Sequence, residues 1–270
     1  MRKNKFAIAI SVVTIASFAI VMMILTAVKK NSFVKVAKQQ LIIEVRRGGV
    51  DAVENLLTEY RLNPDSVDDD GQTLLIVAIG RKDDPQQMRL IKTLLIHGAD
   101  VNHESLYGGY PVVATIQDGN FNIYRLLIEH GATVSSPNNY TCWAAMGGNN
   151  DIVNDLINRG ANVNYYDSNG VTPLHCASNA KVTDYLIAKG ADINAKDKYV
   201  TTGGVDLNTT IVDDGATPLH MAIKGYKVDV VQTLLAHGAD KTIVNRQGLT
   251  PRELAVRLGY NDIVEMLDKQ

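Results

Sequence analysis

The arrangement of apolar and polar residues divides this chain of 270 residues into two parts. Residues 6–28, FAIAISVVTIASFAIVMMILTAV, contain no charged side chain, whereas the remainder alternates short apolar stripes with polar turns. Segments such as DIVNDLI (151–157) and VDVVQTLL (228–235) repeat apolar residues at intervals of three and four, which predicts amphipathic helices. We therefore expect an all-α protein that is preceded by one uniformly apolar segment.

The apolar segment is long enough to cross a membrane. At about 1.5 Å rise per residue, residues 6–28 span a hydrocarbon core of roughly 30 Å. The run exceeds the roughly 7 to 15 apolar residues of a signal-peptide core, and Lys29 and Lys30 stand where a cleavage site would end. We expect an uncleaved transmembrane anchor in residues 1–30; a cleaved signal peptide and a buried core helix are the alternatives.

Basic residues flank this segment on both sides: Arg2, Lys3 and Lys5 before it, and Lys29, Lys30, Lys35 and Lys38 after it. The count slightly favours a cytoplasmic domain after the segment. However, a short basic tail resembles the start of a bacterial export signal, and moving it outward opposes the membrane potential. We expect the bulk of the chain on the outer side, periplasmic if the chain is bacterial, with the cytoplasmic face as the alternative.

A glycine motif recurs along the rest of the chain. It reads HGADVN, HGATV, RGANVN, KGADIN and HGADKT, with glycines at positions 98, 131, 160, 190 and 238. A second motif precedes each glycine, and its fullest forms are NGVTPLHCA and DGATPLHMA. Together they resemble the ankyrin repeat, which has a period of about 33 residues and the signature TPLHxA.

The resemblance covers roughly residues 36–270. It implies an ankyrin-repeat domain over residues 31–270, built as an all-α solenoid of about seven helix pairs joined by β-hairpin loops, with the first and last pairs atypical. We call these loops, which join one helix pair to the next, the finger loops. One helix pair cannot bury its apolar faces alone, so neighbouring pairs must stack.

The residue types of the motifs suit helix ends. Thr172, Thr217 and Thr250 are placed to cap the first helix of a pair, and the proline after each fits the first helical position, where no N–H is needed. The glycines of the other motif, such as Gly190 and Gly238, suit the left-handed conformation that ends a helix.

The largest irregularity is an insertion at residues 195–214. Gly190 and Thr217 are 27 residues apart where 12 suffice, so 15 residues are extra, including KYVTTGGVDLNTTIV at 198–212. β-Branched residues around a Gly-Gly pair predict an extended β-hairpin, and a mobile loop and an insertion without a role are the alternatives. A hairpin that contacts a partner would use Tyr199, Val200, Val205, Leu207 and Ile211.

Three smaller irregularities precede the insertion. In the first full repeat, RKDDPQQM at 81–88 carries about four extra residues between the helices. The finger loop after Gly131 is four residues shorter than the loop after Gly160. The repeat that begins at Thr172 is three residues shorter than the one at Thr217, so we expect a tighter turn between its helices near Asn179.

Charge and chemical motifs exclude several function classes. The net charge is −2, so no basic excess indicates nucleic-acid binding. No catalytic, phosphate-binding or metal-ligand spacing is present, and we expect no cofactor and no metal. His175 and His220 belong to the TPLH motif, where the ring can bond within the turn. His103, beside Glu104, lies outside the repeat pattern, and we expect a solvated pair rather than a catalytic one.

The two cysteines, Cys142 and Cys176, fall in the first helices of consecutive repeats. Packed helices lie about 8 to 10 Å apart, whereas a disulfide needs Cα atoms within about 7 Å. We therefore expect buried thiols rather than a disulfide.

Aromatic residues are the candidate contacts for a partner. Tyr107, Tyr110, Tyr165 and Tyr166 lie on finger loops, and Trp143 lies on a first helix whose outer positions face the concave side. Tyrosine and tryptophan dominate interface hot spots. The alternative for Trp143 is packing between adjacent first helices.

These observations predict a binding protein rather than an enzyme. The ankyrin resemblance implies a concave surface that binds another protein. We expect a membrane-tethered module, without catalysis, that recruits or inhibits a protein partner, and an immunity-type inhibitor is the specific version for a bacterial chain. The alternatives are an enzyme or redox-protection factor using His103, Glu104 or the two cysteines, and a structural subunit of a membrane complex.

Overall fold

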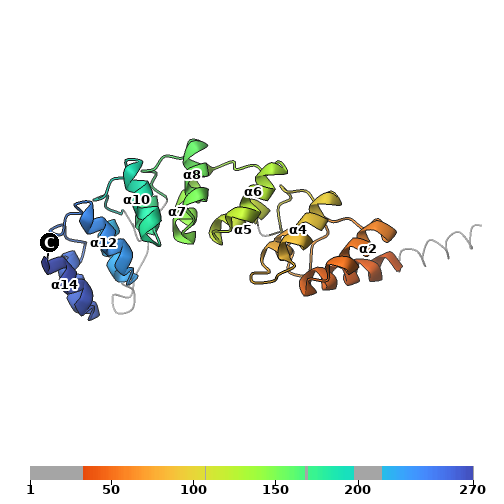
Figure 1. Ribbon diagram of the computed structural model, residues 1–270, viewed down its shortest axis with the longest axis horizontal. Coiled ribbons are helices and arrows are strands. Elements are labelled where there is room, and N and C mark those ends of the chain that lie inside the picture. Colours follow the sequence, from red (N-terminus) through yellow and green to blue (C-terminus); the bar gives the residue numbers. More distant parts are fainter. Residues whose placement is uncertain (1–32, 107, 168–169, 198–214, 270) are drawn as a thin grey trace, which may run out of the picture. The chain divides into compact units, whose positions relative to one another are not determined.

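The computed structural model describes residues 33–106, 108–167, 170–197 and 215–269 (Figure 1). The expected transmembrane segment and the bulk of the insertion lie outside these ranges. So do six candidate contact residues: Tyr107, Tyr199, Val200, Val205, Leu207 and Ile211. Among the described residues, no helix has both the length and the apolar character needed to cross a membrane.

The described residues form seven successive helix pairs. A helix that includes residues 33–47 pairs with α2 (Val50–Tyr60). The next pairs are α3 (Leu74–Ile79) with α4 (Gln87–Ile96), α5 (Pro111–Gln117) with α6 (Phe121–Glu129), and α7 (Pro137–Gly147) with α8 (Asn150–Asn158). The last pairs are α9 (Pro173–Cys176) with α10 (Ala180–Ala188), α11 (Pro218–Lys224) with α12 (Val228–Ala236), and α13 (Pro251–Leu258) with α14 (Asn261–Lys269).

The expectation of β-hairpin finger loops is wrong for the loops that the structure describes. No strand occurs there, and one isolated antiparallel bridge joins Val67 to Thr73. The loops close with single turns instead, as at Asp167, whose N–H donates to the carbonyl of Val171 at 3.1 Å. One such pair of residues is too short to make a strand.

The chain divides into two compact units, one ending at Tyr110 and the other beginning at Pro111. In the first unit, apolar residues of successive helices are fully buried, among them Leu41, Leu74 and Leu90. Arg46 donates to Asp68 and Asp70 at 2.9 Å each, which joins the first helix to the following finger loop.

In the second unit the helix pairs follow one another from α5 to α14 (Figure 1). The second helices bury one apolar residue after another along the row, including Leu127, Leu156, Leu186 and Leu234. This continuous burial across neighbours is what a single pair could not achieve alone.

The predicted caps are present at the first helices. Thr172 and Thr217 form capping boxes with histidines three residues later, and Thr250 forms one with Glu253. Proline occupies the first helical position in each case. At the other end, Gly190 and Gly238 have φ values of 89° and 81°, as expected for residues that end a helix in the left-handed region.

Asparagine side chains join successive finger loops. Asn164 Oδ1 accepts the N–H of Asp192 at 2.8 Å, and Asn194 Oδ1 accepts the N–H of Asp240 at 2.9 Å. The asparagine of the GANVN and GADIN motifs therefore satisfies a backbone donor of the next repeat, which explains why the motif extends beyond its glycine.

The insertion leaves the base of its finger loop unchanged. The N–H of Asp197 donates to the carbonyl of Ala216 at 3.0 Å, and the N–H of Ala216 donates to Asp197 Oδ1 at 2.9 Å. Asp167 and Val171 make the same two bonds in the preceding loop, at 3.1 and 2.9 Å. The residues on either side of the insertion, Asp197 and Ala216, thus keep the ordinary pairing.

The shortened repeat loses its residues from a helix, and not from the turn near Asn179. Helix α9 has four residues, whereas α11 has seven. The backbone becomes extended at Ala177, where ψ is 132°. The N–H of the next residue, Ser178, donates to the carbonyl of Ala145 on α7 at 3.2 Å. The expected location of the shortening was therefore wrong, because backbone partners outside α9 end it after one turn.

The shortened finger loop after Gly131 is followed by a longer helix, whereas the shortened repeat at Thr172 has a shorter one. Helix α7 begins at Pro137 and has 11 residues, so Asn139, which takes the place of the capping threonine of other repeats, lies inside it. The Thr141 hydroxyl donates to the carbonyl of Pro137 at 2.8 Å. Residues that would form loop elsewhere therefore form an additional turn of helix here.

Candidate functional site

A pocket of about 580 Å³ opens in the second unit, beside the additional turn of α7. Its lining residues come from α7 on one side and from the finger loop and start of α9 on the other: Asn138, Asn139, Tyr140, Cys142, Trp143, Tyr165, Asp167, Val171 and Pro173. The pocket brings together two of the predicted contact residues, Trp143 and Tyr165.

The α7 side of the pocket is aromatic. Tyr140 and Trp143 are three residues apart, so they share a face of the helix, and their ring centroids lie 5.7 Å apart. The Trp143 side chain keeps 38% of its surface exposed. Met146, another three residues along, is 59% exposed and extends the apolar surface beyond the pocket. Exposed large apolar residues in one row are typical of an interaction surface.

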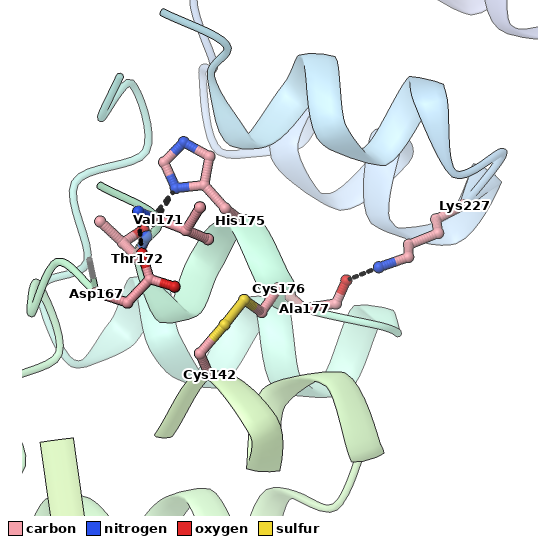
Figure 2. Close-up of a disulfide and its surroundings, with 8 residues drawn as sticks. All are labelled: Cys142, Asp167, Val171, Thr172, His175, Cys176, Ala177 and Lys227. Carbon is pink, nitrogen blue, oxygen red and sulfur yellow. Dashed lines mark hydrogen bonds between the residues drawn. A yellow bond between two sulfur atoms is a disulfide. The ribbon is translucent and has the colours of Figure 1, made fainter. Parts of the chain in front are cut away.

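The opposite side of the pocket is held in place by the turn of the finger loop. Tyr165 is half-buried, and its N–H donates to the carbonyl of Asn162 at 2.9 Å. Asp167 Oδ1 accepts the N–H of Val171 at 2.9 Å, which fixes the chain just before α9 (Figure 2). The two sides together present aromatic rings, amides and one carboxylate.

The other predicted contact residues lie elsewhere. Tyr166 is 39% exposed and does not line the pocket. Tyr110 belongs to the first unit, where its hydroxyl donates to Glu104 Oε2 at 2.8 Å. His103 lines a different hollow of that unit, together with Tyr60 and Leu106. Glu104 thus has a tyrosine as its hydrogen-bond donor.

The expectation of free thiols is wrong. Cys142 and Cys176 form a disulfide, with their Cα atoms 5.5 Å apart (Figure 2). The spacing of about 8 to 10 Å applies to helix axes, whereas Cα atoms lie about 2.3 Å from their axis. Cα atoms on facing sides of two helices are therefore closer than the axes by more than 4 Å, which brings them within reach of a disulfide. Buried alanines at positions 144, 145 and 177 permit this close approach.

His175 fixes the start of α9 beside the disulfide. Its Nδ1 accepts the N–H of Thr172 at 3.2 Å, and its Nε2 lies 3.0 Å from the carbonyl oxygen of Ala216. Because a carbonyl only accepts, Nε2 carries the proton and the ring is neutral. Burial lowers the pKa of His175, since it disfavours the charged form.

No group of three or more histidine, cysteine, aspartate or glutamate side chains suited to a metal ion occurs in the part of the chain that the structure describes. The pocket offers aromatic and amide groups, with Cys142 held in the disulfide.

Comparison with known proteins agrees with the repeat motifs. A family model for ankyrin repeats, in three copies, matches residues 41–138, 82–164, 136–197 and 198–269. The chain belongs to the ankyrin-repeat family. Ankyrin repeats indicate a protein–protein interaction module, and the fold of this ankyrin-repeat chain is all-helical over its described residues.

Similar proteins share the repeats within longer chains. The potassium channel AKT2/3 of Arabidopsis thaliana is 30% identical over 159 residues, 57% of this chain and 19% of the channel. Alpha-latrocrustotoxin-Lt1a of Latrodectus tredecimguttatus is 38% identical over 167 residues, 54% of this chain and 12% of the toxin. Ankyrin repeat protein OPG189 of Variola virus is 26% identical over 242 residues, 78% of this chain and 43% of the viral protein. The ankyrin-repeat chain thus spans 12 to 43% of these relatives.

Sequence reasoning missed Asn138, Asn139 and Tyr140. They include Asn139, the position equivalent to the capping threonine of other repeats, where the finger loop normally ends. The shortened finger loop after Gly131 was the available signal. A loop that lacks four residues ends sooner, so the residues that follow it can join the next helix, α7.

Proposed function

We propose that this ankyrin-repeat chain is a membrane-tethered binding module that holds a protein partner at the pocket beside α7, and so recruits or inhibits it without catalysis. One observation carries the proposal: Tyr140, Trp143 and Tyr165 surround a pocket of about 580 Å³, with Trp143 still 38% exposed. An aromatic anchor next to a hollow is the arrangement of an interface hot spot.

The composition of the pocket favours a protein over a small charged ligand. Among the residues that the structure describes, the lining includes one carboxylate, Asp167, and no lysine, arginine or histidine. Asn138 and Asn139 supply amide donors and acceptors that suit a peptide backbone. The aromatic rings supply the apolar contact area.

The membrane tether and the outer location are part of the same proposal. The apolar residues 6–28 support the tether. The disulfide supports the outer side, because disulfides form and persist in oxidising compartments and are rare in the cytosol. For a bacterial chain this corresponds to the periplasm, where an immunity-type inhibitor that blocks an enzyme is the specific version.

The disulfide also supports a role without catalysis. A cysteine nucleophile requires a free thiolate, and both cysteines are bonded to each other. Glu104, the proposed partner of His103, accepts a hydrogen bond from Tyr110. In this state the cysteines supply no thiolate nucleophile, and the Glu104 carboxylate is bonded to Tyr110.

Affinity capture with pocket variants tests the proposal. The full chain, tagged at the C-terminus and purified in detergent from its own host, is compared with Trp143→Ala, Tyr165→Ala and, as control, Ile96→Ala. Ile96 is 79% exposed on α4 and does not line the pocket. We expect both pocket variants to lose the partner about 30-fold, as for a hot-spot residue worth about 2 kcal/mol, and the control to keep it.

Full retention of the partner by Trp143→Ala and Tyr165→Ala contradicts the proposal. A complex of fixed stoichiometry that survives both changes indicates a structural subunit instead. A further variant that lacks residues 200–210 tests the insertion separately, and we expect it to capture less partner.

A further inference from the structure

The disulfide connects the two sides of the pocket. Cys142 lies on α7 within the pocket lining, between Tyr140 and Trp143, and Cys176 ends α9, whose first residue Pro173 lines the opposite side. The bond therefore limits how far the opposite sides can move apart. It is a crosslink between consecutive repeats at the place where the candidate site opens.

Helix α9 depends on contacts from outside itself. A single turn of four residues has too few internal hydrogen bonds to be stable alone. Its N-terminal end is held by the capping box of Thr172 and His175. After its C-terminal end, the N–H of Ser178 donates to the carbonyl of Ala145, and the Lys227 ammonium donates to the carbonyl of Ala177. The disulfide is the covalent addition to this weakly supported end (Figure 2).

We propose that the Cys142–Cys176 disulfide is a redox-controlled crosslink of the binding pocket: when oxidised it holds α9 against α7 and keeps the pocket preformed, and its reduction loosens α9 and weakens partner binding. The claim that reduction weakens partner binding rests on the proposed function of the pocket. The claim that the disulfide holds α9 against α7 concerns the ankyrin repeats alone and is measured without a partner.

The chemistry is thiol–disulfide exchange. To form the bond, the Cys142 and Cys176 thiols give up two protons and two electrons to a disulfide donor, either a small-molecule disulfide or an oxidised dithiol protein, which leaves as two thiols. In the reverse direction, one thiolate of a dithiol reductant attacks the Cys142 sulfur to form a mixed disulfide, and the Cys176 sulfur leaves and takes up a proton. The second thiolate of the reductant then attacks its own sulfur in the mixed disulfide, so the reductant leaves as a disulfide and the Cys142 sulfur takes up a proton. Cys142 is half-buried and lines the pocket, while Cys176 is 9% exposed, so the reductant reaches Cys142 first.

A bound partner opposes this reduction. A partner seated against Tyr140 and Trp143 covers the residue between them on the same helix, Cys142. Reduction and partner binding are therefore expected to be mutually unfavourable, because each acts on the same side of the pocket.

The redox state is tested first. Cells that produce the full chain are lysed in a thiol-alkylating reagent, and the chain is digested and analysed by mass spectrometry without reduction. We expect the peptide that contains Cys142 to be linked to the peptide that contains Cys176. Two alkylated, unlinked cysteines overturn the proposal.

Hydrogen exchange tests the mechanical half. Amide exchange of residues 174–178 is measured in the full chain with and without a dithiol reductant, and in the double variant Cys142→Ser with Cys176→Ser as the matched control. We expect reduction to speed exchange of these amides about tenfold in the parent chain and to have no effect on the variant, which exchanges fast throughout. Unchanged exchange on reduction overturns the proposal.

Partner capture completes the test. Reduction is expected to weaken capture about tenfold in the parent chain and to leave the double serine variant unaffected. Faster exchange with unchanged capture overturns the control of binding. If the pocket is not the binding site, Trp143→Ala retains the partner in both the oxidised and the reduced chain. This result distinguishes failure of the proposed function from failure of the redox control.

Discussion

The ammonium nitrogen of Lys227, at the start of α12, lies 2.8 Å from the carbonyl oxygen of Ala177, just after α9 (Figure 2). Because α9 ends at Cys176, no further helical turn supplies a backbone N–H to this carbonyl. Burial lowers the pKa of Lys227, and nearby Asp229 opposes that shift. A side chain of the following repeat thus replaces the missing turn.

Replacing Lys227 by methionine should expose the importance of that contact. Lys227→Met keeps the apolar stem but leaves the Ala177 carbonyl unsatisfied, which costs about 1–3 kcal/mol. Urea unfolding of the full chain measures the loss. Lys181→Met, at an exposed position of α10, is the control and should change the free energy of unfolding by less than about 0.5 kcal/mol. Equal effects of the two changes would count against the role of Lys227.

Reduction of the disulfide should lower global stability. The two cysteines are 34 residues apart in the sequence, and a chain-entropy model assigns about 4 kcal/mol to closing a loop of that size. We expect the urea midpoint of the parent chain to fall on addition of a dithiol, while that of Cys142→Ser with Cys176→Ser stays constant. A parent midpoint that does not respond to the reductant contradicts the prediction.

Stability should also fall in mild acid because of His175. Its pKa in the folded chain is lowered by burial, whereas the unfolded chain has the ordinary value of about 6.5. The unfolded state therefore binds the proton first, so this contribution is complete above about pH 6.5 and is lost as the pH falls towards the folded pKa.

The measurement compares the parent with His175→Gln, which does not titrate. Between pH 7.5 and 5.5 the parent should lose about 1 kcal/mol more unfolding free energy than the variant. The other histidines are common to both chains and cancel. Parallel pH profiles would show that His175 does not contribute to the acid loss.

The insertion should be removable without loss of stability. Replacing residues 198–214 by Ser-Asn, the two residues at 168–169, retains the paired Asp197 and Ala216. Since each halving of a flexible loop lowers its closure cost by roughly 0.6 kcal/mol, we expect an unfolding free energy equal to or above that of the parent.

Asp197→Ala serves as the contrast for that replacement. It removes the carboxylate that accepts the N–H of Ala216, a buried backbone donor, and should cost about 1–3 kcal/mol. The prediction would be wrong if the loop replacement lowered the free energy of unfolding and Asp197→Ala did not.

The local rules of the repeat were readable from the sequence because they depend on neighbouring residues. Thr217 with the following proline fixes a helix start, and Gly238 fixes a helix end through its backbone angle, whatever surrounds them. The TPLH histidines bond within their own turn, as at Thr172 and His175, and this was predictable for the same reason.

The pocket and the disulfide depend on geometry between repeats, which residue spacing does not give. The lengthened α7 and the shortened α9 each follow from an irregularity visible in the sequence, yet their juxtaposition required the three-dimensional structure. The same holds for Cys142 and Cys176, because an average distance between helix axes does not state which faces meet.

Photo-crosslinking shows whether a protein partner lies against the pocket beside α7. The photoreactive residue p-benzoylphenylalanine replaces Tyr140 in the pocket or, as control, the exposed Gln232 of α12, in the full chain within its own cells. We expect a covalent adduct with a single protein from position 140 that is lost when Trp143→Ala is added, and none from position 232. An adduct of the same protein from position 232 alone would contradict this expectation.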